Sequence, residues 1–254
     1  MVMPPDRADP GEVEAFRAAR ERVLRQIADA CERVGRDPAG VTLVAVSKTV
    51  DAERLRSAVE AGLTILAENR VQEAEAKVPL VPGATWHLVG PLQSNKARRA
   101  LETFGLIQSV DSADLARRLD RLAADVRPDA PGGRFPILLQ VNVDDDHAKA
   151  GFEPAALAHE LDEILALPRL EVRGLMTIGR LTDRPESARS TFRGLRELAE
   201  RLGDGRPGLG AELSMGMSAD FAVGVEEGAT IVRVGRALFG ERPDHHEHVP
   251  EGRC

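Results

Sequence analysis

The sequence predicts a (β/α)8 or TIM barrel, an α/β fold, preceded by an additional N-terminal helix. Eight short apolar runs alternate with longer polar stretches of helical character. The runs are rich in β-branched residues and nearly continuous, as expected of parallel strands that are buried on both faces. The chain has 254 residues, close to the length of one such barrel. An open doubly wound sheet is the alternative, but no GxGxxG motif follows the first predicted strand to favour it.

The N-terminal helix is predicted over about residues 11–35, because apolar side chains recur there at helical spacing among charged ones. A Gly-Arg-Asp-Pro turn that starts at Gly35 ends it. The barrel is expected to occupy about residues 38–242, and residues 243–254 are expected to form a disordered tail. No linker is long enough to divide the chain, so residues 1–254 are expected to form a single domain.

Each predicted strand is an apolar run bounded by polar or turn-forming residues. The eight runs cover residues 41–47, 63–69, 85–90, 106–111, 135–143, 170–177, 211–216 and 230–235. Between them lie segments rich in arginine, glutamate and alanine, which are typical of the helices that surround a barrel. These segments include residues 51–61, 94–103, 112–125, 153–166 and 184–202.

Composition excludes several classes of function. The net charge of −7 argues against a nucleic-acid-binding protein, which would present a basic face. No run approaches the roughly 18 apolar residues of a membrane span, and the N-terminus lacks the apolar core of a secretory signal. The two cysteines, Cys31 and Cys254, lie far apart and fit a reducing compartment. We therefore expect a cytoplasmic protein with no nucleic-acid or membrane partner.

Lys48 directly follows the first predicted strand, at the edge where a β/α barrel builds its active site. Strand alternation places Val44, Val46 and Lys48 on one face. An amine at the end of an apolar strand is partly desolvated, which favours the neutral form that can make a Schiff base. The alternative is a lysine that extends into solvent or pairs with a carboxylate.

The last two strands predict a phosphate site. Arg233 shares a face with Ile231, and Gly235 follows where the chain turns toward a helix. The loops after the seventh and eighth strands usually bind phosphate in this fold, and residues 214–218 (SMGMS) add hydroxyl groups there. The alternative is a glycine turn beside an arginine in a structural ion pair. Together with Lys48, these features predict a phosphate-bearing carbonyl compound held as an imine, either pyridoxal 5′-phosphate (PLP) or the sugar phosphate of a Schiff-base aldolase.

No metal centre is predicted. The acidic segment 144–147 follows the fifth strand and is interpreted as a solvated loop, and the histidines of the tail as incidental. A catalytic zinc barrel would place histidines at strand ends, whereas only His87 lies within a predicted strand. We expect His87 to be packed in the protein rather than to act as an acid or base.

Several longer segments occur together in the order of a known family. They are AVSKT (45–49), AENRVQEAEAK (67–77), WHLVGPLQSNKAR (86–98), QSVDS (108–112), VNVDDDHAKAGF (141–152), GLMTI (174–178), LSMGMSADF (213–221) and VRVGRALFG (232–240). Over about residues 12–242 the chain resembles the YggS/PROSC family, the pyridoxal phosphate homeostasis proteins. The resemblance implies a barrel like the N-terminal domain of alanine racemase, without that enzyme's second domain.

The resemblance also implies six PLP-binding residues. Lys48 matches the lysine that carries the cofactor as a Schiff base, and Asn69 matches a pocket asparagine. Arg233 matches the arginine that faces the pyridine nitrogen. The family's phosphate-binding positions match Ser218, Gly235 and the backbone of Arg236.

The implied function is PLP binding in intracellular PLP homeostasis, with no significant catalysis. An arginine at the pyridine nitrogen disfavours ring protonation and weakens the cofactor as an electron sink. The chain has no tyrosine, whereas the related racemase uses a lysine and a tyrosine on opposite faces of the cofactor. A PLP-dependent amino-acid racemase-like enzyme is the alternative.

The implied partners are PLP and the apo forms of PLP-dependent enzymes. A monomer is expected, because the second domain that helps to build the racemase dimer is absent. Lys96 and Lys149 lie in or beside loops at strand ends and are candidates for an accessory, transient PLP site. Lys77 is expected on the solvated face of a helix.

Overall fold

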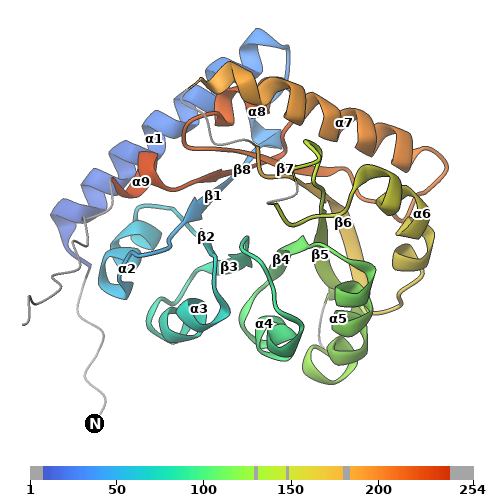
Figure 1. Ribbon diagram of the computed structural model, residues 1–254. Coiled ribbons are helices and arrows are strands. Elements are labelled where there is room, and N and C mark those ends of the chain that lie inside the picture. The colour runs from blue at the N-terminus through green and yellow to red at the C-terminus, as the bar shows by residue number, and fades with distance from the viewer. Residues whose placement is uncertain (1–7, 129–130, 147–148, 180–183, 241–254) are drawn as a thin grey trace, which may run out of the picture.

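The computed structural model is a closed barrel of eight parallel strands surrounded by helices (Figure 1). It describes residues 8–128, 131–146, 149–179 and 184–240, so the predicted tail 243–254 lies outside the described residues. The strands are β1 (Thr42–Val46), β2 (Ile65–Glu68), β3 (Thr85–Leu88), β4 (Leu106–Val110), β5 (Phe135–Gln140), β6 (Leu170–Met176), β7 (Glu212–Met217) and β8 (Ile231–Val234). Each coincides with one of the predicted runs, and the predicted fold class is confirmed.

The strands follow one another around the barrel in chain order. β1 pairs in parallel with β2, with Ala45 opposite Leu66, and the pairing continues around to β8. β8 then pairs with β1, with Val234 opposite Ala45, and this contact closes the sheet. The open doubly wound sheet is therefore excluded, and the last strand lies beside the first.

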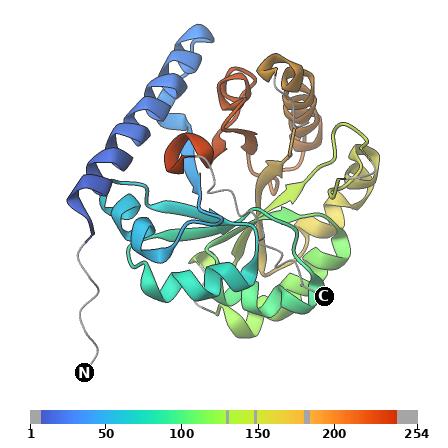
Figure 2. The ribbon, with the colours of Figure 1, turned by 60° about the vertical axis from the view of Figure 1, so that its left-hand side comes forward.

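The additional helix α1 (Pro10–Arg33) packs outside the barrel against α2, α8 and α9 (Figures 1 and 2). Asp9 caps it by accepting the Gly11 amide at 2.8 Å, so the helix begins one residue before the predicted start. The other helices are α2 (Ala52–Glu60), α3 (Val71–Lys77), α4 (Ala97–Thr103), α5 (Ala113–Val126), α6 (Pro154–Leu165), α7 (Arg189–Gly203), α8 (Phe221–Glu226) and α9 (Arg236–Phe239). None of the helices within the described ranges is both long enough and apolar enough to cross a bilayer.

Two apolar layers hold the barrel together. Val44 and Ile231 belong to a cluster inside the barrel, whereas Ala45 and Leu66 belong to the larger layer between the strands and the helices. This is the alternation expected of strands whose successive side chains point to opposite faces. The interior is therefore a packed core, and polar groups that lie within it need hydrogen-bond partners there.

An ion-pair cluster ties α1 and α7 to the end of α8. Arg189 donates to Glu226 at 2.6 Å and to Glu227 at 3.0 Å, and Arg33 donates to Glu226 at 2.6 Å. Because α8 runs back toward the start of β8, this cluster lies at the opposite end of the barrel from the carboxyl ends of the strands. It is therefore remote from the strand ends at which the binding site is predicted.

Candidate functional site

The carboxyl ends of β1 and β2 bring Lys48 and Asn69 to the same edge of the barrel. Val46 pairs with Ala67, and the Ser47 amide continues the ladder by donating to the Ala67 carbonyl at 2.9 Å. Lys48 and Asn69 each follow this paired position by two residues. Both are half-buried. The amine and the amide thus come from neighbouring strands although 21 positions separate them in the chain.

The predicted phosphate residues come from the next two strand ends around the closed barrel. Gly235 directly follows Val234, which pairs with Ala45 of β1. Ser218 follows β7, and its Oγ accepts the Gly235 amide at 3.0 Å. Gly235 is also the residue before α9, which begins at Arg236. Closure of the barrel therefore places a hydroxyl group and backbone N–H groups beside the end of β1, which Lys48 follows by two residues.

Lys48 lies in a tight turn. The Val50 amide donates to the Ser47 carbonyl at 3.0 Å, and Thr49 has a φ of 70°. A positive φ at the third residue is the pattern of a type II turn, where glycine or asparagine is usual. For threonine this conformation is strained by about 1 kcal/mol or more, and contacts around the turn must stabilise it.

Arg233 is buried inside the barrel, with 4% of its surface exposed. It donates to Ser214 Oγ at 2.6 Å and to the Thr177 carbonyl at 2.7 Å. Burial lowers the pKa of Arg233 to about 10, and the carboxylate of Asp220 opposes this shift. The guanidinium therefore stays positively charged at neutral pH and adds a fixed cation beneath the strand ends.

A chain of hydrogen bonds connects Arg233 across the barrel to His87. Ser214 donates to Gln108 Oε1 at 2.6 Å, and Gln108 Nε2 lies 3.0 Å from His87 Nδ1. Because an amide nitrogen can only donate, His87 Nδ1 accepts and the imidazole is neutral. Burial, together with the charge of Arg173, lowers the pKa of His87 to about 4. This arrangement fits a packed histidine that orients a neighbour.

The hydrogen-bonded His87 makes the stability of the protein depend on pH. Between about pH 6.5 and 4, the unfolded chain binds a proton at this histidine that the folded protein does not. The free energy of unfolding should therefore decrease as the pH is lowered from about 6.5 to about 4, by up to about 1.4 kcal/mol per pH unit. His87→Asn keeps an acceptor for Gln108 but cannot titrate. Urea unfolding of both proteins at a series of pH values should show a shallower dependence for the variant, and parallel curves would contradict the assignment.

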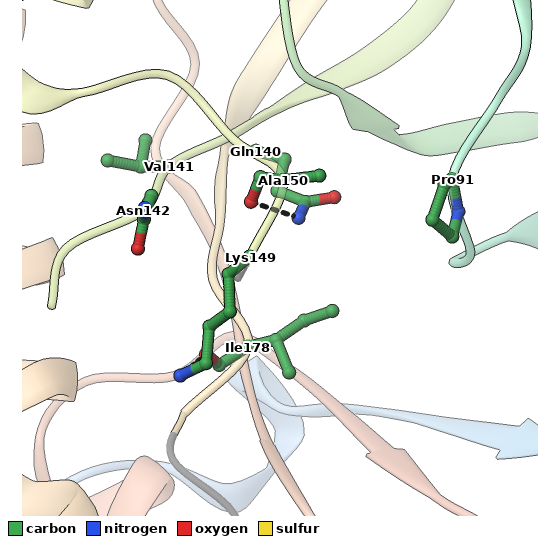
Figure 3. A pocket seen from close by; sticks show the side chains of 7 residues that line it. All are labelled: Pro91, Gln140, Val141, Asn142, Lys149, Ala150 and Ile178. Atoms are coloured by element: carbon green, nitrogen blue, oxygen red, sulfur yellow. Dashed lines mark hydrogen bonds between the residues drawn. The ribbon is translucent and has the colours of Figure 1, made fainter. Parts of the chain in front are cut away.

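A cavity of about 210 Å³ lies at another part of the barrel mouth (Figure 3). None of the six candidate PLP-binding residues lines it. Lys149 Nζ lies 3.3 Å from both Asp144 Oδ2 and the Ile178 carbonyl, and Gln140 donates to the Ala150 carbonyl at 2.7 Å. Its walls are Pro91, Gln140, Val141, Asn142, Lys149, Ala150 and Ile178.

Lys96, the other candidate for an accessory site, is half-buried and ends the short 3₁₀ segment Ser94–Lys96. It does not line the cavity beside Lys149. An accessory role for the two lysines stays a prediction.

Two expectations from the sequence are wrong. The Lys77 side chain is only 14% exposed and donates to Glu68 and to the Ser47 carbonyl, so it is not solvated. Asp144, expected in a solvated loop, is also largely buried and accepts the Thr191 hydroxyl at 2.5 Å. In both cases the hydrogen bond joins a helix to the barrel: Lys77 of α3 reaches Glu68 of β2, and Thr191 of α7 reaches Asp144. Local polarity of the sequence does not reveal such contacts. Among the residues that the structure describes, no group of His, Cys, Asp and Glu side chains is arranged to bind a metal ion; His147 and the tail histidines lie outside them.

Comparison with known proteins gives consistent matches along most of the chain. Residues 20–243 match the family model for the alanine racemase N-terminal domain. The pyridoxal phosphate homeostasis protein of Aquifex aeolicus is 41% identical over 225 residues, covering 87% of this chain and 96% of the relative. That of Pseudomonas aeruginosa is 42% identical over 227 residues, covering 87% and 93%.

Solved structures agree with these matches. PipY of Synechococcus elongatus with PLP bound is 43% identical, has a TM-score of 0.73 and covers 84% of this chain and 100% of its own. Alanine racemase of Clostridium difficile is 17% identical, with a TM-score of 0.65, and covers 87% of this chain and 60% of its own. The racemase likeness shows the shared fold alone.

Proposed function

Since the chain belongs to the pyridoxal phosphate homeostasis protein family, we propose that it binds PLP and takes part in PLP homeostasis. The observation that carries the proposal is the closure of the barrel between β8 and β1, which groups Lys48 with Ser218 and Gly235 at adjacent strand ends. An amine beside hydroxyl and backbone N–H donors fits a phosphate-bearing aldehyde. PLP supplies such an aldehyde, to which an amine adds reversibly.

We propose that Lys48 Nζ makes the covalent contact. The neutral amine attacks the aldehyde carbon, a C=N bond forms, and the aldehyde oxygen leaves as water. Ser218 Oγ and the backbone N–H groups of Gly235 and Arg236 bind the phosphate, and Asn69 lines the pocket. The hydrogen bond from Gly235 N–H to Ser218 Oγ supports this assignment, because it brings the two groups close enough to reach one phosphate, to which the Gly235 N–H would then donate in place of Ser218.

Arg233 supports a carrier rather than a catalyst. We propose that its guanidinium lies at the pyridine nitrogen, where a fixed positive charge disfavours protonation of the ring. An unprotonated ring withdraws electrons weakly and promotes little carbanion chemistry. The bonds to Ser214 and Thr177 support this role by holding the guanidinium in one orientation inside the barrel.

We further propose a cytoplasmic, monomeric protein, with residues 1–254 as one domain and apo PLP-dependent enzymes as recipients of the cofactor. The net charge of −7 fits a protein with no nucleic-acid partner. A reversible covalent link suits transfer, because hydrolysis of the C=N bond restores both the lysine amine and the cofactor aldehyde.

The proposed function predicts uptake of PLP without turnover. The protein incubated with PLP should gain a visible absorption band, and dialysis against an apoenzyme that requires PLP should restore that enzyme's activity. Incubation of the loaded protein with L-alanine, followed by chiral chromatography, should return L-alanine alone. Racemisation at a rate typical of enzymes would favour the racemase-like alternative. A protein that never gains the band would refute PLP binding through a Schiff base.

A further inference from the structure

A buried cluster lies directly behind the Lys48 turn, on the outer face of β1 and β2. Glu68 Oε1 accepts Ser47 Oγ at 2.7 Å and Lys77 Nζ at 2.7 Å. Lys77 Nζ also donates to the Ser47 carbonyl at 3.0 Å. Ser47 and Glu68 have no exposed surface. The three residues therefore form a closed triangle, with the Ser47 backbone carbonyl as one corner, that joins the end of β1, the end of β2 and the last residue of α3.

The Ser47 carbonyl connects this cluster to Lys48. It belongs to the peptide bond whose nitrogen is that of Lys48, so the direction of this carbonyl sets the orientation of the Lys48 backbone. The carbonyl accepts from both Lys77 Nζ and the Val50 amide. The turn includes the strained Thr49, and a second, charge-assisted donor helps to stabilise it in this conformation.

The placement of Glu68 and Lys77 excludes direct contact with a ligand among the strand ends inside the barrel. Glu68 follows Ala67, which faces the interior, so alternation directs Glu68 outward toward the helices. Ser47 likewise points outward, because it bonds to Glu68. The cluster therefore acts on the site from behind, through the backbone.

We propose that Glu68 and Lys77 are positioning residues that hold the Ser47–Val50 turn and thereby direct the Lys48 amine to the cofactor aldehyde. The proposal rests on the proposed function, since it assigns Lys48 the covalent contact. Lys77 supplies the hydrogen bond to the Ser47 carbonyl. Glu68 accepts hydrogen bonds from the Lys77 ammonium group and the Ser47 hydroxyl, and so holds both groups beside the Ser47 carbonyl.

The test is PLP binding by Lys77→Met, which keeps most of the side-chain volume and removes the donor. We expect PLP affinity, from titration of the visible band, to fall about tenfold, the scale of one lost charge-assisted hydrogen bond. The double variant Glu68→Gln/Lys77→Met removes both buried charges and avoids an unpaired carboxylate. It should show the same loss, so the proposal stays testable if the single variant folds poorly.

A cycle with Lys48→Ala separates positioning from a general structural effect. If Lys77 acts through Lys48, then Lys77→Met should not change residual, non-covalent PLP binding in the Lys48→Ala background. Binding of 4-deoxypyridoxine 5′-phosphate, which has no aldehyde, should likewise be equal in wild type and Lys77→Met. Non-covalent PLP binding and binding of the analogue can each be measured by equilibrium dialysis or by the fluorescence of Trp86, the one tryptophan of the chain. An equal loss in all of these measurements would assign Lys77 a structural role and overturn the proposal.

Glu227→Gln is the matched control, because Glu227 is a largely buried carboxylate bonded to arginines at the other end of the barrel. It should lower stability and leave the PLP titration unchanged. A wild-type protein without the visible band would contradict the proposed function itself. A wild-type band with unchanged affinity in Lys77→Met would contradict only the positioning role.

Discussion

Replacing Lys48 with alanine is expected to abolish the visible absorption band that PLP gives with the protein and to weaken PLP binding by roughly a hundredfold or more. The band requires the C=N bond, and Lys48 is the lysine that the closed barrel places beside Ser218 and Gly235. The proposed phosphate contacts persist in the variant, so weak, non-covalent binding without the C=N band should remain. Absorption spectra and equilibrium dialysis with PLP measure the two effects separately.

Lys48→Arg is a second test of the same assignment, because arginine keeps the positive charge but does not form a Schiff base under these conditions. It should also lose the band.

Lys96→Ala and Lys149→Ala serve as lysine controls and should retain the band. If they also leave uptake and transfer of PLP unchanged, the accessory site should be abandoned. A band that persists in Lys48→Ala would assign the covalent link to another lysine. Absence of the band in every protein, wild type included, would make the Schiff-base aldolase the hypothesis to test.

The sequence allowed prediction of the strands and of the face on which their residues lie. Val44 and Ile231 were placed on single faces by alternation alone, and both lie inside the barrel. This succeeds because alternation is a local property of an extended chain. That Lys48 and Gly235 lie on neighbouring strand ends is a non-local property. It can be predicted only when the strands are known to close into a barrel, since 187 positions separate the two residues.

The hydrogen-bonded groups inside and behind the site were largely missed. Gln108 and Ser214 are polar residues within apolar runs, a signal that marks each as unusual but does not identify its partner. Their bond depends on register across the barrel. Lys77 was misjudged for a related reason, because a long side chain at the end of a short helix can reach inward to a carboxylate of the adjacent strand. Partner choice therefore requires the packing of α3 on β2, which local polarity does not encode.

Gly90→Ala is expected to lower the free energy of unfolding by about 2–3 kcal/mol and to weaken PLP binding at the same time. A Cβ atom at Gly90 would lie 2.2 Å from the Asn69 carbonyl oxygen and 2.7 Å from the Asn69 Cα. Both are backbone atoms, so no side-chain rotation relieves the clash. Gly90 is itself held, because its carbonyl accepts the Ser109 hydroxyl at 2.6 Å. The strand end that carries Asn69 must therefore move.

The thermal midpoint of Gly90→Ala should fall by about 4–12 °C, and its PLP titration should shift to higher concentration. Gly203→Ala is the matched control. Gly203 ends α7, and no atom lies within 4 Å of a Cβ built there, so alanine should be neutral or stabilising by about 0.5–1 kcal/mol. A large loss of stability with unchanged PLP binding would mean that the displaced segment is not part of the pocket. That result would remove Asn69 from the proposed site while leaving Lys48 and the phosphate residues in place.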